Sequence, residues 1–264
     1  MTTTAQAQQT VSHWPLARRV VSGFVQPGGP AMVARAAEGG GLGEGSRVVE
    51  LAPGLGLTSA LVAGRGVRTW TGVEPDAMAA GHLRKAMAGA GREVVQAPLG
   101  ATGLEEGAAS VVLADALLST LAEDDRAAVL AEGARLLRAG GRLVVLDVTP
   151  AAGVHGAAAG RAALEDAGIA MLDVDAWRAA LEAAGLVVVG SLTGPLDLPA
   201  PPALMREAGP RLALRITREV ATDGAVRGPA IAARDALAMH APVLRSVVAV
   251  GEMPLILGMR RPRR

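Results

Sequence analysis

The chain has 264 residues, of which 50% are hydrophobic and 19% charged, with a formal net charge of +1. This apolar content is sufficient for a folded core and excludes a largely disordered chain. No apolar run approaches the ~18 residues that span a bilayer, and the N-terminus lacks the basic-then-apolar pattern of a secretion signal, so we expect a cytoplasmic protein. The chain has no cysteine, which removes thiolate ligands and cysteine nucleophiles, and we expect no metal site.

Aromatic side chains are scarce, with three tryptophans, one phenylalanine and no tyrosine. Base stacking requires aromatic faces, and binding to a phosphate backbone requires an excess of positive charge. The chain offers neither, so we expect no nucleic-acid partner and favour a small-molecule ligand.

The N-terminal region precedes the first strand-like pattern. Residues 1–10 are polar, whereas residues 11–38 mix apolar and basic positions and are broken by a Pro-Gly-Gly-Pro turn at 27–30. This pattern predicts two short helices. We therefore expect residues 1–44 to form a tail and a helical cap, and residues 45–264 to form the main domain.

From residue 46, short β-branched runs alternate with longer Ala/Leu-rich runs. The predicted strands are 47–51, 67–73, 92–96, 110–115, 142–148 and 186–192, and the predicted helices are 57–64, 75–89, 124–138 and 173–184. Strands separated by helices require right-handed crossovers. The pattern predicts an α/β fold with a Rossmann-like, doubly wound, mostly parallel sheet.

The alternation stops after Leu196. Residues 200–240 look helical, and the apolar run at 254–261 is a candidate for a final edge strand. We therefore expect a helical insertion, or lid, at about 197–250 before the last strand.

A strand-to-helix turn carries the most informative motif. The segment RVVELAPGLGLTS (47–59) places Glu50 near the end of a strand, followed by Ala52, Pro53, Gly54 and Gly56. Glycines at such a turn allow the backbone to approach a ligand closely. An acidic group beside the turn opposes a phosphate, but it attracts an ammonium group.

A second acidic residue, Glu74, ends the next predicted strand in TGVEPD (71–76). A carboxylate at this point can accept both hydroxyls of an adenosine ribose. With Glu50, it favours a positively charged nucleoside without phosphate over a dinucleotide, and S-adenosylmethionine (SAM) has these properties.

These segments resemble the class I SAM-dependent methyltransferases, in particular their small-molecule, methyltransferase type 11-like branch in actinobacteria. VVELAPGLG matches the glycine-rich turn of the family, GVEPD its ribose-binding acid, SVVLADALLS (110–119) its fourth strand, and LLRAGGRLVVLDV (136–148) its fifth. Ala52 departs from the usual first glycine. The resemblance implies SAM as cofactor and assigns its site to Glu50, Ala52, Pro53, Gly54, Gly56, Glu74, Pro75, Pro98, Leu99 and Asp115.

The acceptor pocket of such a fold opens above the carboxyl ends of the strands. Residues 11–38 and 197–250 would cover it, and their apolar content suggests a small, apolar acceptor methylated by in-line displacement. His13 and His155 are the candidate bases, and His13 and Trp14 are the candidate substrate-facing pair.

Two other functions are compatible with the same residues. An NAD-dependent oxidoreductase would use the same Gly-x-Gly turn and Glu74, and a non-catalytic scaffold would keep the fold without turnover. A homodimer is also possible.

Overall fold

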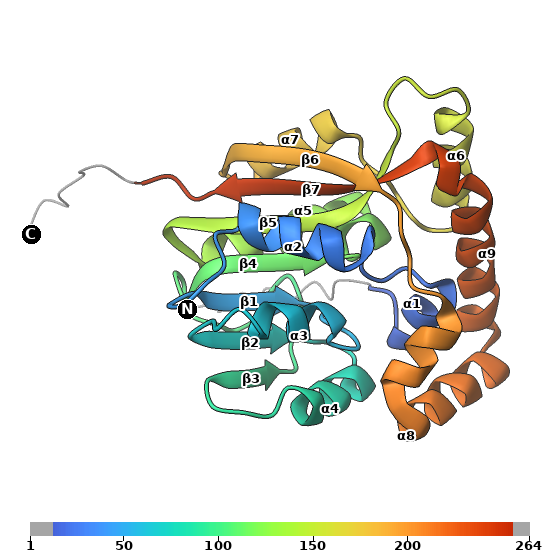
Figure 1. Ribbon diagram of the computed structural model, residues 1–264, viewed down its shortest axis with the longest axis horizontal. Helices are drawn as coiled ribbons and strands as arrows, with labels where there is room; N and C mark the ends of the chain where they lie inside the picture. Colours follow the sequence, from blue (N-terminus) through green and yellow to red (C-terminus); the bar gives the residue numbers. More distant parts are fainter. Residues whose placement is uncertain (1–12, 256–264) are drawn as a thin grey trace, which may run out of the picture.

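The computed structural model describes residues 13–255, which form a seven-stranded sheet flanked by helices (Figure 1). The strand order is β3-β2-β1-β4-β5-β7-β6. The strands are β1 (Arg47–Leu51), β2 (Thr69–Val73), β3 (Arg92–Val95), β4 (Ala109–Asp115), β5 (Leu137–Pro150), β6 (Val187–Pro195) and β7 (Leu244–Glu252). Strands β1 to β5 are parallel, and β7 runs antiparallel to both of its neighbours. The predicted Rossmann-like, mostly parallel fold is thus confirmed.

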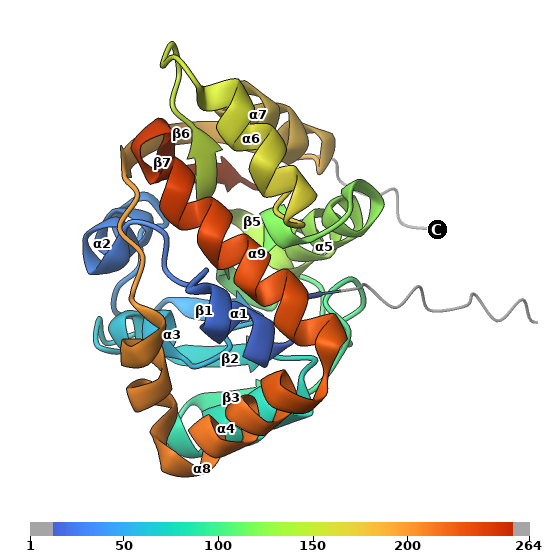
Figure 2. The same cartoon turned by 90° about the vertical axis from the view of Figure 1, so that its right-hand side faces the viewer.

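The helices cover both faces of the sheet and its carboxyl end. They are α1 (Leu16–Ser22), α2 (Gly29–Gly39), α3 (Leu57–Ala63), α4 (Ala77–Ala86), α5 (Glu123–Leu136), α6 (Ala157–Asp166), α7 (Val174–Ala183), α8 (Pro201–Thr222) and α9 (Gly224–His240), with 3-10 turns η1 (Leu118–Thr120) and η2 (Ala241–Val243). Helices α1, α8 and α9 lie across the carboxyl ends of the parallel strands (Figures 1 and 2).

The central strands are buried on both faces, and alternate residues enter two different cores. In β1, Val49 packs with residues of α5 and α7, whereas Val48 packs with residues of α2, α3 and α4. This two-sided burial explains why the strand reads as a short apolar run and not as an alternating one.

The last strand differs from the prediction. The last strand of the described part of the chain is β7 at Leu244–Glu252, and most of the predicted strand segment 254–261 lies outside the described residues. Strand β7 is an interior strand, and β6 forms the edge. The helical part of the predicted 197–250 insertion therefore ends with α9 and η2, before Leu244. Helix α6 was not predicted.

Packing around Gly72 in β2 gives a test of the core. An added Cβ would lie 2.5 Å from Cη2 of Trp70, a side chain that is completely buried. The indole has no room to move, so we expect Gly72→Ala to lower the free energy of unfolding by about 2 kcal/mol in urea denaturation. The matched control is Gly190→Ala in β6, where an added Cβ meets no atom within 4 Å. Equal stability of the two variants would contradict this account.

Candidate functional site

Three acidic side chains meet at the carboxyl end of the sheet. Glu50 lies in β1 one residue before the strand ends, Glu74 follows β2, and Asp115 ends β4. Because β1 lies between β2 and β4, the three residues share one edge of the sheet. Their exposed fractions are 1%, 2% and 7%, so the structure forms a buried acidic cluster.

Each carboxyl group has identified donors. Trp70 Nε1 donates to Glu50 at 2.7 Å, and the Thr58 hydroxyl donates to Asp115 at 2.5 Å. The backbone N–H groups of Gly54 and Asp76 donate to the two oxygens of Glu74, at 2.9 and 3.0 Å. Within the described chain, Glu50 Oε1 and Asp115 Oδ1 accept no hydrogen bond, so the cluster keeps acceptor capacity.

Arg19 of α1 supplies the positive charge beside this cluster. Its guanidinium donates to the backbone carbonyl of Ala52 at 2.6 Å and to that of Asp115 at 3.3 Å. A Cβ added at Gly54 would lie 3.1 Å from Nη1 of Arg19, so the guanidinium lies against the glycine-rich turn. Arg19 is 7% exposed.

Burial dominates the electrostatics of the cluster. It raises the pKa of Glu50 to about 7, against the effects of the Ser59 hydroxyl, the hydrogen bond from Trp70 and the charge of Arg19, and the charge of Asp115 adds to the rise. It also raises the pKa of Asp115 to about 6 and shifts the pKa of Glu74 upward. Such groups are stabilised when a cation lies beside their ionised forms.

Backbone strain is concentrated at the same place. Among the described residues, the non-glycine residues in the left-handed region are Gln26, Ala52 and Ala116, with φ of 47°, 49° and 48°. Ala52 follows β1 directly, Ala116 follows β4 directly, and Gln26 Nε2 donates to the Thr58 hydroxyl at 2.9 Å. Left-handed alanines cost of order 1 kcal/mol or more and cluster at functional sites.

The glycine-rich turn has the predicted conformation. Gly54 and Gly56 have positive φ of 62° and 79°, and Gly56 precedes α3. Pro53 lies in this turn, and Pro75 precedes α4, whose N-cap Asp76 accepts from two backbone N–H groups. The structure thus brings the predicted residues of β1 and β2 together around one turn.

The residues predicted after β3 lie differently. Leu99 is 1% exposed and packs in the apolar core beside α5, whereas Pro98 is half-buried. The assignment of Pro98 and Leu99 to the cofactor site stays a prediction.

The predicted substrate-facing pair lines a cavity of about 470 Å³. His13 and Trp14 form part of its wall, with Arg18 from α1 and Thr120 from η1. Trp14 also packs edge-to-face on Phe24, and the Arg18 guanidinium lies 3.7 Å from its ring centroid. His155, in contrast, is exposed in the turn before α6 and does not line this cavity.

Several residues of the site were missed from the sequence. Arg19, Gln26, Thr58 and Trp70 all contact the acidic cluster or its turn. Their roles depend on tertiary contacts, because each belongs to an element whose local sequence predicts only a helix, a turn or a strand. Nε2 of His82 in α4 also lies 3.2 Å from the carbonyl oxygen of Leu55 in the turn.

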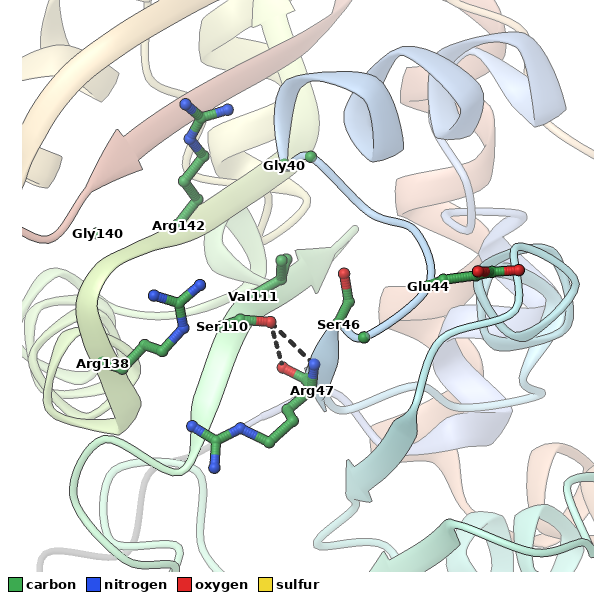
Figure 3. A pocket seen from close by; sticks show the side chains of 11 residues that line it. Gly40, Glu44, Ser46, Arg47, Ser110, Val111, Arg138, Gly140 and Arg142 are labelled. Carbon is green, nitrogen blue, oxygen red and sulfur yellow. Dashed lines mark hydrogen bonds between the residues drawn. The ribbon is translucent and has the colours of Figure 1, made fainter.

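A polar cavity of about 390 Å³ lies at the opposite, amino end of the strands (Figure 3). Arg47, Arg138 and Arg142 line it, and Ser110 exchanges hydrogen bonds with the backbone of Arg47. Arg142 pairs with Glu252 at 2.9 Å. Because this cavity is at the far end of the sheet, it is separate from the acidic cluster.

Within residues 13–255, no helix is long and apolar enough to cross a membrane. In the same part of the chain, no group of His, Asp and Glu side chains is arranged to hold a metal ion.

Comparisons with known proteins agree with this geometry. A family model described as "Methyltransferase domain" matches residues 49–145, which run from β1 into β5. Among curated proteins, none matches the sequence.

Solved structures of the same fold share little sequence with this chain. The [4+2]-cyclase SpnF has a TM-score of 0.64 and 18% identity, covering 85% of this chain and 80% of its own. A sarcosine dimethylglycine methyltransferase from Galdieria sulphuraria has a TM-score of 0.59 and 14% identity, and the match covers 85% of this chain and 84% of that protein. The geranyl diphosphate C-methyltransferase of Streptomyces coelicolor A3(2), in complex with S-adenosyl-L-homocysteine, has a TM-score of 0.52 and 16% identity. The match covers 84% of this chain and 79% of that protein.

The chain has a Rossmann-like fold with a buried acidic cluster at the carboxyl ends of its strands. The match to a methyltransferase domain over residues 49–145 agrees with SAM as the cofactor. The chemistry of the site fits this cofactor. The unfilled acceptors of Glu50 and Asp115 and the carbonyl of Ala52 suit a cation, and Glu74 suits a ribose.

Proposed function

We propose that this protein transfers the methyl group of SAM to a small molecule held in the cavity that His13 and Trp14 line. The observation that carries the proposal is the acidic cluster of Glu50, Glu74 and Asp115 around the glycine-rich turn. In this assignment Glu74 binds the ribose hydroxyls, and the carboxyl groups of Glu50 and Asp115 stabilise the positively charged end of the cofactor.

The cavity supports the acceptor part of the proposal. Its volume of about 470 Å³ falls within the range of small-molecule sites. Helix α1 lies between the cavity and the acidic cluster, because Arg18 lines the cavity whereas the next residue, Arg19, reaches the strand ends. The two sites are therefore neighbours across one helix. In-line transfer requires contact between the acceptor atom and the methyl group, so α1 must move aside for the reaction.

The walls of the cavity combine apolar and charged groups. Trp14 and Leu121 offer apolar surface, whereas Asp125, Glu165 and Arg18 are charged. An acceptor with an apolar body and one polar group matches such walls better than a wholly apolar molecule.

The cofactor, when bound, supplies an activated methyl group on its sulfonium, and transfer by in-line displacement requires positioning and exclusion of water. The chain's own part is to seat the acceptor against Trp14 and to exclude water from the reacting groups. Where the acceptor must lose a proton, we assign its removal to His13, a titratable side chain in the cavity wall.

Blocking the cavity tests this assignment. Ala122, at the start of α5, lines the cavity. With methyl-labelled SAM and a panel of small phenols, amines and carboxylic acids, we expect Ala122→Phe to raise the KM of the best acceptor about tenfold, because one pocket contact is worth about 1–3 kcal/mol. The affinity for S-adenosylhomocysteine should not change.

The control is Ala131→Phe, an exposed position on the same helix outside this cavity. An acceptor KM that is the same in both variants would contradict the assignment of the cavity. Cofactor binding without transfer to any acceptor would favour the non-catalytic alternative. A cytoplasmic location and a homodimer stay predictions.

A further inference from the structure

Helix α1 lies at the carboxyl ends of the parallel strands, where the acidic cluster is formed (Figure 2). Its first residue, Leu16, donates its backbone N–H to Asp76 at 3.2 Å, and Arg19 reaches the ends of β1 and β4. Leu16 and Val20 are buried in an apolar cluster with residues of α8, α9 and the glycine-rich turn. The turn that must approach the cofactor is thus closed by this chain's own helix.

The contacts of Arg19 are those that a bound ammonium group would need. Its N–H groups donate to two backbone carbonyls, Ala52 O and Asp115 O, at neighbouring strand ends. Its positive charge acts on all three carboxyl groups of the acidic cluster. A second cation cannot use the same carbonyls while the guanidinium occupies them.

The chain on the C-terminal side of α1 is built to change direction. Gly23 ends the helix with φ of 74°, and Gly28 and Gly29, with φ of 84° and 63°, begin the next one. Short glycine-containing connections of this kind absorb the dihedral changes of a hinge. Helix α1 is not part of the sheet, so its displacement leaves the hydrogen bonds between the strands intact.

We propose that Arg19 is a built-in occupant of the subsite for the α-ammonium group of the cofactor, and that cofactor binding requires its guanidinium, together with α1, to leave this position. The proposal rests on SAM being the cofactor. It makes α1 a competitor of the cofactor and gives the acidic cluster a counter-charge when no cofactor is bound.

Cofactor affinity tests the competition. If the closed form is populated about nine-tenths of the time, the apparent Kd of the cofactor is raised about tenfold. We therefore expect Arg19→Met, which keeps an apolar stem without the charge, to bind S-adenosylhomocysteine about tenfold more tightly than the wild type in titration calorimetry. Arg35→Met, which removes an exposed guanidinium on α2, should leave this Kd within twofold.

A second ligand separates charge competition from simple covering. 5′-Methylthioadenosine lacks the amino-acid part, so its Kd should change less than twofold in Arg19→Met. An equal gain for both ligands would overturn the ammonium-subsite proposal, and so would unchanged or weaker binding of S-adenosylhomocysteine. If neither Arg19→Met nor the wild type bound S-adenosylhomocysteine, the cofactor assignment itself would be refuted.

Hydrogen exchange of the wild type gives a readout that does not depend on how the variant folds. On saturation with S-adenosylhomocysteine, we expect the amides of α1 to exchange several-fold faster, while those of α5 do not change. Unchanged or slower exchange in α1 would overturn its release.

Discussion

Replacing Glu74 with alanine is expected to raise the Kd for S-adenosylhomocysteine at least about 100-fold, because a carboxylate that binds both ribose hydroxyls contributes two charge-assisted hydrogen bonds of about 1.5–3 kcal/mol each. Titration calorimetry measures the change. The carboxylate also accepts from the backbone N–H groups of Gly54 and Asp76, so Glu74→Gln should be measured beside it to preserve part of the turn.

The control for Glu74 is Glu93→Ala, an exposed glutamate on the neighbouring strand β3. A ligand control identifies the ribose as the group bound. The 2′,3′-dideoxy analogue of S-adenosylhomocysteine should bind wild type and Glu74→Ala equally weakly. If alanine weakened both ligands by the same factor, Glu74 would be a support for the turn and not a ribose ligand.

The parallel half of the sheet was predictable because each strand, turn and helix carries its own local signal. The apolar run of β1, the glycines after it and the N-cap Asp76 of α4 mark their boundaries without tertiary information. The acidic cluster was predictable for a related reason. Parallel strands that are neighbours must bring their carboxyl ends, and so Glu50 and Glu74, to one edge.

Strand β7 could not be located in the same way. It is buried on both faces between β5 and β6, and its apolar run therefore lacks the alternation that marks a strand. It also follows η2 directly after α9, so the pattern favoured a longer helical insertion. Its partners β5 and β6 lie more than 90 and nearly 50 residues earlier in the sequence, and only these pairings define it.

The role of Arg19 could not be predicted from the sequence for a different reason. The segment LARRVVS of α1 contains two adjacent arginines, and in sequence they are equivalent. Only the docking of the helix turns Arg19 toward the carbonyl of Ala52 and Arg18 toward Trp14. Which charge is buried is decided by packing against α8 and α9, which lie nearly 200 residues later.

The free energy of unfolding should fall as the pH rises from 5 to 8, and Glu50 should be a main cause. Its folded-state pKa of about 7 is raised above the ordinary value of 4.5 by burial. The stabilisation from its protonated form is complete below the unfolded pKa and is lost as the pH rises through the folded one. For a shift of this size the loss is about 3 kcal/mol.

Glu50→Gln should remove this part of the pH dependence, because an amide does not ionise and its oxygen still accepts from Trp70. Urea denaturation of the cofactor-free protein at pH 5 and pH 8 measures the difference, with Glu44→Gln, an exposed loop position, as the control. Because the pKa of Asp115 is also raised, the free energy of unfolding of the variant should still fall between pH 5 and pH 8, but by less than that of the wild type.

The same group links pH to cofactor binding. A ligand whose ammonium group lies beside Glu50 stabilises the ionised form of this residue, so binding at pH 6 must release a proton that is already gone at pH 8. The affinity for S-adenosylhomocysteine should therefore increase between these pH values in the wild type and much less in Glu50→Gln. Equal pH profiles for binding and for unfolding in the two proteins would mean that Glu50 is not the titrating group and does not face the positive end of the cofactor.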